Sequence, residues 1–260
     1  MKLFYRQFGS GKPLIILHGL LGLSDNWVSI GKILALNYNV IIPDLRNHGQ
    51  SPHSGNFSYD VMARDIVELL DDLGMKSAVI MGHSMGGKVA MQFALQYPEK
   101  TDKLIVVDIS MRQYDERQYQ IEILEAMMAI DFQKAVSRAD ISESLKLSIK
   151  DEKFRLFIMK NLYRQTRSEL GWRPDLKNIY LNIDRVFEGI TGDRVYIGPS
   201  LFVHGSESDY VLPSDIPVIV QNFPQAVFKI VPDSGHWVHA DNPEGFLNAI
   251  GGFLELQKMP

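Results

Sequence analysis

The sequence contains no cysteine among its 260 residues. This absence excludes a disulfide-stapled scaffold, a thiolate zinc site and a cysteine nucleophile, so a covalent nucleophile would have to be an oxygen or an amine. A run of about 18 apolar residues, as needed for a membrane-spanning helix, is also missing. Residues 1–9 alternate instead of forming the apolar core of a signal peptide. We therefore expect a soluble, cytoplasmic protein.

Charge and apolar content narrow the class of protein further. The chain has 27 basic and 31 acidic residues, so its net charge is −4 and no global electrostatic field recruits nucleic acid. Hydrophobic residues make up 45% of the chain and aromatic residues 10%, which excludes a mostly disordered protein. The length suits one large α/β domain or two small ones.

Short apolar runs alternate with helical patterns along most of the chain. Continuous runs are typical of parallel strands buried on both faces, whereas residues 59–73 have helical spacing that ends at Gly74. This order predicts an α/β fold with a doubly wound, mostly parallel sheet of about seven strands. The alternating residues 1–9 predict an antiparallel edge strand. The apolar runs are 14–17, 40–42, 78–81, 104–107, 201–203 and 227–231.

The alternation of strands and helices stops after Val107. About 90 residues then have helical periodicity without a strand-like run, which is more than a single crossover helix needs. We predict a core formed by residues 1–110 and 197–260, with residues 111–196 inserted as a helical lid after the strand that ends near Asp108. An insertion at this end of a strand lies over the crevice where α/β sheets bind ligands.

The pentapeptide Gly82-His83-Ser84-Met85-Gly86 directly follows a predicted strand and precedes a helical pattern. A G-x-S-x-G sequence in this context indicates a nucleophile elbow, a turn too tight for side chains at its glycines. The elbow would hold Ser84 in strained backbone geometry at the N-terminus of a helix, whose dipole favours negative charge. The alternative is a glycine-rich turn without catalysis.

A serine hydroxyl is a weak nucleophile near neutral pH and needs a base. Among seven histidines, His236 fits best, because it follows a strand end at the same sheet edge as Ser84 and comes later in the chain. His239 is the competing candidate. The acid that orients the base is either Asp108, which ends a buried strand beside the crevice, or Asp209. The strand-end position favours Asp108.

An oxyanion hole needs backbone N–H groups aimed at the developing negative charge. Residues 18–22 follow a strand and can turn the chain over the pocket. The expected donors are the amides of Leu20 and Met85, the latter being the residue after the nucleophile. We interpret His18 and the charged residues of the 44–53 loop as packing residues.

Four segments, His18-Gly19, 44–53, 82–88 and 235–239, carry a family resemblance. They make the sequence resemble the α/β-hydrolases, and more narrowly the small bacterial YbfF-type esterases, over residues 1–110 and 197–257. The resemblance implies hydrolysis of short- to medium-chain acyl esters and some acyl-CoA thioesters, with no metal or cofactor.

The same resemblance bears on the acid. Such relatives tend to have an aspartate where Asp108 stands and to lack the usual acid. That acid would stand three residues after Gly205, where this chain has Ser208, with Asp209 displaced by one. Ser208 would then be a hydrogen-bonding partner of Asp108.

The predicted lid has no motif that identifies its ligand. Residues 146–173 carry eight basic and three acidic side chains, a net charge of +5 in a chain whose total is −4. They form either a solvated helix face or a contact for the phosphates of an acyl-CoA. Flexible and aromatic side chains of the lid either line an acyl cavity or hold the lid to the core: Met127, Met128, Phe132, Phe157 and Met159.

Together these features predict a serine carboxylesterase or thioesterase that forms an acyl-enzyme on Ser84. Its partner would be a small acyl ester or thioester, and the protein a monomer or a small homo-oligomer. The alternatives are a C–C bond hydrolase or lyase on the same fold, and a ligand-binding homologue without turnover.

Overall fold

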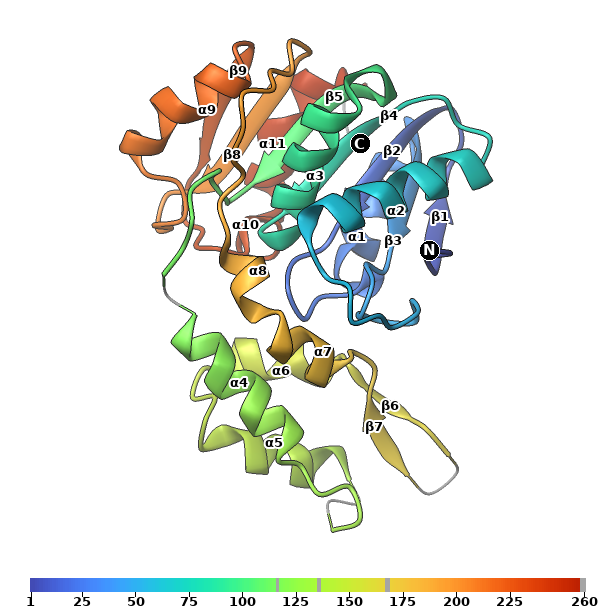
Figure 1. Ribbon diagram of the computed structural model, residues 1–260, viewed down its shortest axis with the longest axis vertical. Coiled ribbons are helices and arrows are strands. Elements are labelled where there is room, and N and C mark those ends of the chain that lie inside the picture. Colours follow the sequence, from blue (N-terminus) through green and yellow to red (C-terminus); the bar gives the residue numbers. More distant parts are fainter. Residues whose placement is uncertain (116, 135–136, 167–168, 258–260) are drawn as a thin grey trace.

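The computed structural model describes residues 1–115, 117–134, 137–166 and 169–257. Within these ranges a seven-stranded sheet has the order β1-β3-β2-β4-β5-β8-β9 (Figure 1). β1 pairs antiparallel with β3 at the edge, and the other neighbours pair parallel. Every predicted apolar run lies within a strand, which confirms the predicted sheet. The strands are β1 (Tyr5–Phe8), β2 (Lys12–Leu17), β3 (Tyr38–Pro43), β4 (Ala78–His83), β5 (Thr101–Val107), β8 (Ser200–Gly205) and β9 (Ala226–Val231).

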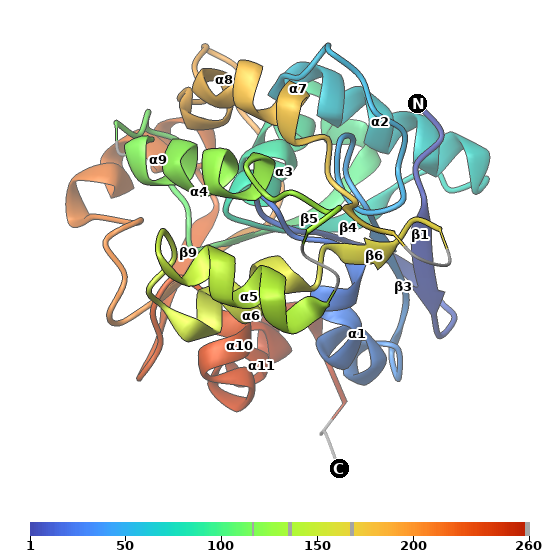
Figure 2. The same ribbon diagram turned by 90° about the horizontal axis from the view of Figure 1, so that it is seen from below.

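Helices cover both faces of the sheet, so two apolar cores form. Ile80 and Val106 belong to the core under α2, α3 and α9, whereas their neighbours Met81 and Val107 belong to the core under α1 and α11. Figure 2 shows α2 and α3 on one side of the sheet and α1, α10 and α11 on the other. Burial on both faces explains why the central strands are continuously apolar, whereas the edge strand β9 leaves Val227 and Ile230 exposed. These helices are α1 (Val28–Leu34), α2 (Tyr59–Asp72), α3 (Met85–Gln96), α9 (Ile216–Asn222), α10 (Val238–Asp241) and α11 (Pro243–Leu254), with short 3-10 turns at Ser24–Trp27, Pro98–Lys100 and Pro213–Asp215.

The chain between β5 and β8 forms helices and a short hairpin that lie below the sheet in Figure 1. The hairpin corrects the expectation that this region has no strand: Leu162 pairs with Trp172 and Arg164 with Leu170. Each of its strands has three residues, which is too short for an alternating pattern to stand out. The elements are α4 (Gln118–Met128), α5 (Arg138–Lys146), α6 (Glu152–Met159), β6 (Leu162–Arg164), β7 (Leu170–Trp172), α7 (Leu176–Leu181) and α8 (Ile183–Phe187).

Helical periodicity located α4 and α6 but did not decide which of their side chains are buried. Leu124 and Met127 are fully buried, whereas Met128 is 41% exposed and Leu156 is 59% exposed. Leu162, which comes three residues after Met159 and so shares its helical spacing, lies in β6 instead. In the part of the chain that the structure describes, no helix has the length and apolar character needed to cross a membrane.

Candidate active site

Ser84 alone makes the turn between β4, which ends at His83, and α3, which begins at Met85. Its φ of 52° and ψ of −122° place a residue other than glycine in the left-handed region, at a cost of about 1–3 kcal/mol. The flanking glycines are needed because a Cβ on Gly82 would lie 2.0 Å from the carbonyl oxygen of Gly86. The segment therefore has the tight strand–turn–helix form that its sequence predicts, with Ser84 at the apex.

Three side chains from different segments form one hydrogen-bonded line. Ser84 Oγ lies 3.0 Å from His236 Nε2, and His236 Nδ1 lies 2.7 Å from Asp108 Oδ2. Because a carboxylate only accepts, Nδ1–H is the donor to Asp108 and Nε2 is left to accept the serine proton. Asp108 is fully buried, whereas the His236 side chain is 25% exposed. The His236 ring is thus held by Asp108 at one nitrogen and partly exposed to solvent.

Asp108 follows β5, which lies between β4 and β8 in the sheet. Its Oδ1 accepts the Gly205 N–H at 3.0 Å, and its Oδ2 accepts the Ser208 hydroxyl at 2.5 Å. The alternative acid, Asp209, lies at another contact, where its backbone carbonyl accepts a hydrogen bond from Arg112. The structure therefore brings Asp108 to the histidine, and Ser208 to the acid.

Other histidines near Ser84 are buried and lack its hydroxyl as a partner. The competing candidate, His239, is 8% exposed and stacks on Trp27 with ring centroids 3.8 Å apart. Burial, reinforced by His83, His236 and Lys160, holds the pKa of His239 well below 6.5. Burial likewise lowers the pKa of His83 to about 3, and its ring bonds the backbone carbonyl of His236 at 2.8 Å. His83 thus anchors the backbone of the base as a neutral ring.

The two residues predicted to supply oxyanion donors, Leu20 and Met85, both line the cavity around Ser84. Met85 is the first residue of α3, so its N–H belongs to the helix-terminal amides that lack an intrahelical acceptor. The 18–22 loop turns tightly, with the Gly22 N–H bonded to the Gly19 carbonyl at 2.9 Å. A Cβ on Gly19 would lie 3.2 Å from the Cβ of Ser84. The loop therefore packs directly against the elbow.

The loop at 44–53 is hydrogen-bonded to the 18–22 loop, which packs against the elbow. Arg46 bonds both carboxylate oxygens of Asp65, at 2.6 Å and 2.7 Å. The ring of His18 accepts the Leu45 N–H at 2.9 Å, and burial lowers the pKa of His18 to about 4. These contacts tie the 44–53 loop to α2 and to the 18–22 loop, in line with the packing role that the sequence indicates for it.

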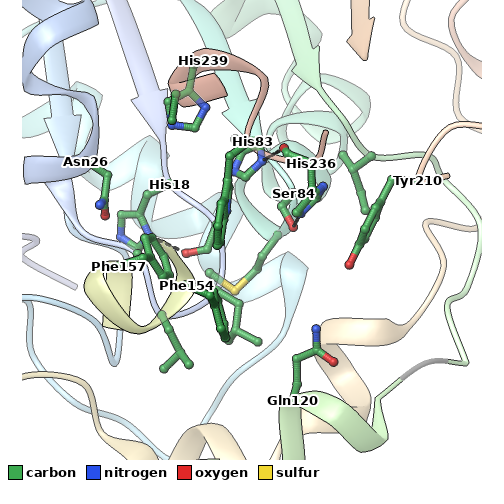
Figure 3. A pocket seen from close by; sticks show the side chains of 18 of the residues that line it. His18, Asn26, His83, Ser84, Gln120, Phe154, Phe157, Tyr210, His236 and His239 are labelled. Carbon is green, nitrogen blue, oxygen red and sulfur yellow. Dashed lines mark hydrogen bonds between the residues drawn. The ribbon is translucent and has the colours of Figure 1, made fainter. Parts of the chain in front are cut away.

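Ser84 and His236 lie in a cavity of about 440 Å³ (Figure 3). Figure 3 shows Phe154 and Phe157 on one side of Ser84 and Tyr210 on the other. The Tyr210 ring stacks on the His236 ring with centroids 3.8 Å apart. A cavity of this size, with aromatic side chains on two sides of the nucleophile, suits a small apolar ligand. Further lining residues are Trp27, Tyr59, Ile109, Tyr114, Ile123, Leu156, Val186, Phe187 and Trp237.

Most of the predicted acyl-cavity residues lie elsewhere. Phe157 lines the cavity, but Met127 and Met159 are buried in the apolar core, and Met128 is 41% exposed. Phe132 packs against the edge of Trp172. The spacing of α4 and α6 revealed a hydrophobic face but not what that face contacts.

The basic segment 146–173 reaches the cavity in part. Lys153 and Lys160 line it, whereas Arg155 bonds the backbone carbonyls of Ile149 and Lys150. Arg167 lies outside the described residues. Among the residues that are described, no cluster of three or more His, Asp or Glu side chains could hold a metal ion.

Comparison with known proteins places this geometry in a family. Residues 12–243 match the family model described as alpha/beta hydrolase fold. The chain belongs to the α/β-hydrolase family. It is 37% identical over 253 residues to a Danio rerio protein named sn-1-specific diacylglycerol lipase ABHD11, covering 95% of this chain and 80% of that one.

Two further members of the family are similar over nearly the whole chain. Esterase YbfF of Escherichia coli (strain K12) is 30% identical over 245 residues, which are 94% of each chain. A solved structure described as a marine microorganism esterase superposes with a TM-score of 0.93 at 40% identity, covering 98% of this chain and 99% of that one. The α/β-hydrolase described here is therefore a hydrolytic enzyme of the esterase and lipase type.

Proposed function

We propose that this α/β-hydrolase is a serine carboxylesterase that hydrolyses short- to medium-chain acyl esters through an acyl-enzyme on Ser84. The observation that carries the proposal is the hydrogen-bonded line from Ser84 through His236 to the buried Asp108. A strained serine at a helix N-terminus, a histidine with one free nitrogen and a buried carboxylate are the parts that acyl transfer requires.

In the first half-reaction, Ser84 Oγ attacks the acyl carbonyl carbon as its proton passes to His236 Nε2. The imidazolium that forms is held by Asp108, which accepts the Nδ1–H without taking the proton. Negative charge on the carbonyl oxygen meets the amides of Leu20 and Met85. His236 then gives its proton to the alcohol oxygen, and the carbon–oxygen bond of the ester breaks.

In the second half-reaction, water takes the place of the alcohol. His236 accepts a proton from the water, whose oxygen attacks the acyl-enzyme, and the carboxylic acid leaves as Ser84 regains its proton. The exposed side of His236 gives water access, whereas its stacking on Tyr210 keeps the ring in one plane.

We further propose that residues 111–196 act as a lid over a core formed by residues 1–110 and 197–260. Ten of the residues that line the cavity come from this inserted segment: Tyr114, Gln120, Ile123, Lys153, Phe154, Leu156, Phe157, Lys160, Val186 and Phe187. Their mostly apolar character suits an acyl chain, and a cavity of about 440 Å³ has room for one of short or medium length.

A thioester of coenzyme A is a second candidate substrate, supported by Lys153 and Lys160 at the cavity. Two ammonium groups attract phosphates, although Asp241, 3.9 Å from Lys153, offsets part of their charge. Glyceride esters also belong in a substrate panel, because the Danio rerio relative is named for diacylglycerol.

The decisive experiment compares wild type with Ser84→Ala on p-nitrophenyl esters of two to twelve carbons. We expect at least a ~10⁴-fold loss of kcat/KM in the variant, because the nucleophile is gone. A fluorophosphonate probe should label wild type and not the variant. Turnover retained by Ser84→Ala would refute the acyl-enzyme, and a wild type that resists the probe would favour a ligand-binding protein.

The same panel separates the substrate classes. Butyryl-CoA, a diacylglycerol and a dioxo acid test thioester, glyceride and C–C bond hydrolysis, with products identified by mass spectrometry. If the two lysines bind phosphates, the KM for butyryl-CoA should rise with ionic strength while that for a neutral ester stays constant. A dioxo acid as the preferred substrate would instead assign the C–C bond reaction.

A further inference from the structure

Lys88 lies one turn into α3, the helix that begins at the nucleophile, and its backbone N–H bonds the Ser84 carbonyl at 3.1 Å. Its side chain is only 1% exposed. The ammonium group donates to the backbone carbonyl of Arg112 at 2.9 Å and also to that of Glu188. This buried lysine thus donates two of its three N–H groups to carbonyls of residues that are 76 positions apart in the chain.

Those two carbonyls belong to the segments by which the chain leaves the core after β5 and returns to it after α8 (Figure 1). We call residues 108–114 and 186–190 the neck. The two segments bond each other directly: Tyr114 N–H to the Phe187 carbonyl at 2.9 Å, and Ile190 N–H to the Met111 carbonyl at 2.8 Å. Lys88, which belongs to the core, therefore donates hydrogen bonds to both segments of the neck.

The rings of two tyrosines also lie close to the Lys88 ammonium. Lys88 Nζ lies 4.8 Å from the ring centroid of Tyr114 and 5.7 Å from that of Tyr59. The Tyr59 hydroxyl donates to the Val186 carbonyl, and the Tyr114 hydroxyl donates to the Tyr210 carbonyl at 2.6 Å. The neck is thereby fixed to α2 and to the residue that stacks on the catalytic histidine.

The chemistry of this position argues for a role beyond filling space. Burial, with Arg112 adding to it and Glu188 opposing it, lowers the pKa of Lys88 to about 7. Methionine has nearly the same length and would occupy an apolar site without the desolvation of an amine. What only the lysine provides is hydrogen bonds to both neck carbonyls at once.

We infer that Lys88 is a positioning residue that clamps the neck to the nucleophile helix and so sets the inserted wall of the cavity opposite Ser84. The wall residues Val186 and Phe187 lie within the neck itself, and Ile123 lies in the first helix after it. Lys88 is itself one of the residues that line the cavity, and through these wall residues it acts on acyl chains long enough to contact them. The effect on acyl length rests on the proposed esterase function, whereas the clamping of the neck does not.

The test compares wild type with Lys88→Met. The amides of Tyr114 and Ile190 report on the pairing of the neck, and in the variant their hydrogen exchange should speed up about tenfold. The amide of Ile105, within β5, should exchange at its wild-type rate after correction for global stability. In esterase assays, KM for p-nitrophenyl octanoate should rise about tenfold, with a much smaller change for p-nitrophenyl acetate, which is too short to need the wall.

Val89→Ala is the matched control, because Val89 is a buried neighbour on α3 in the apolar core. Val89→Ala should lower Tm, but it should not speed up hydrogen exchange at the neck more than elsewhere, and its effect on KM should not depend on acyl length. Lys88→Arg, which keeps charged donors, should recover part of the protection. If Lys88→Met does not fold, Lys88→Gln, a shorter neutral donor, is measured in the same way.

Unchanged exchange at Tyr114 and Ile190 in the folded variant would overturn the inference, whatever the esterase assays show. If exchange rises and no ester is hydrolysed by wild type, the clamp stands and the proposed function fails.

Discussion

Replacing Asp108 with asparagine reverses one hydrogen bond in the candidate triad. The Asp108 carboxylate accepts from His236 Nδ1 at 2.7 Å, from the Ser208 hydroxyl at 2.5 Å and from the Gly205 N–H at 3.0 Å. In Asp108→Asn the amide oxygen can keep the Gly205 contact, which places an NH₂ group opposite His236. Two donors cannot bond, so Nδ1 loses its proton and becomes the acceptor.

The loss of activity expected for Asp108→Asn follows from this change in the tautomer of His236. With Nδ1 deprotonated, the neutral ring carries its proton on Nε2, the atom 3.0 Å from Ser84 Oγ, and can no longer accept the serine proton. We expect kcat/KM for p-nitrophenyl butyrate to fall about 10³- to 10⁴-fold, which is about 4–5.5 kcal/mol of transition-state stabilisation. The near-identical size of asparagine should leave the fold intact, as circular dichroism and Tm can verify.

Asp209→Asn provides the matched control. Asp209 contributes its backbone carbonyl to Arg112, and this contact survives the substitution. Its kcat/KM should therefore stay within about threefold of wild type. A larger loss at Asp209 than at Asp108 would refute the assignment of the acid, and equal small losses would refute a charged partner for His236 altogether.

The remaining predictions concern stability. The pKa of Lys88 is about 7 in the folded protein against 10.5 ordinarily, so the unfolded chain binds more protons between these values and stability rises with pH there. The unfolding free energy of wild type minus that of Lys88→Met should grow by about 2 kcal/mol from pH 7 to pH 9 in urea titrations, and a flat difference would contradict the lowered pKa. Gly82→Ala should cost more than about 3 kcal/mol, because its Cβ would meet the Gly86 carbonyl oxygen at 2.0 Å. Gly252→Ala, in α11 with nothing within 4 Å of the new Cβ, should add about 0.5–1 kcal/mol, and equal Tm values for the two variants would refute the clash at the elbow.

Local periodicity was enough to predict the sheet. Central strands buried on both faces are apolar at every position, so their runs marked them, and the run 227–231 marked the edge strand β9 although two of its five side chains are exposed. Gly74, with a φ of 66°, ended α2 where expected. The inserted segment was harder, because helical spacing shows that a side is apolar but not what covers it. Met128 and Leu156 kept the spacing and are nevertheless exposed.

The candidate site was predictable where its signals are local. Glycines flank Ser84 because a Cβ there would clash, and Gly235 directly precedes His236 after the last strand. The structure places these two side chains within hydrogen-bond distance. Tyr210 gave no such signal, and Lys88 stood only as the last residue of the 82–88 segment with no role to assign. Each acts on segments far away in the sequence, Tyr210 on His236 and Lys88 on the neck.

Asp108 and Ser208 are 100 residues apart in the sequence, but in the fold they belong to one hydrogen-bonded arrangement. Parallel strands end at the same edge of the sheet, so the residue after β5 and the loop after β8 both reach His236. Asp108 supplies the carboxylate, and Ser208 donates to the same oxygen that accepts from the histidine. An aspartate at 208 would set two carboxylates at hydrogen-bond distance in a buried site, where both cannot ionise. With the acid after β5, a neutral donor is therefore what the loop after β8 must present, and a serine there is the counterpart of Asp108.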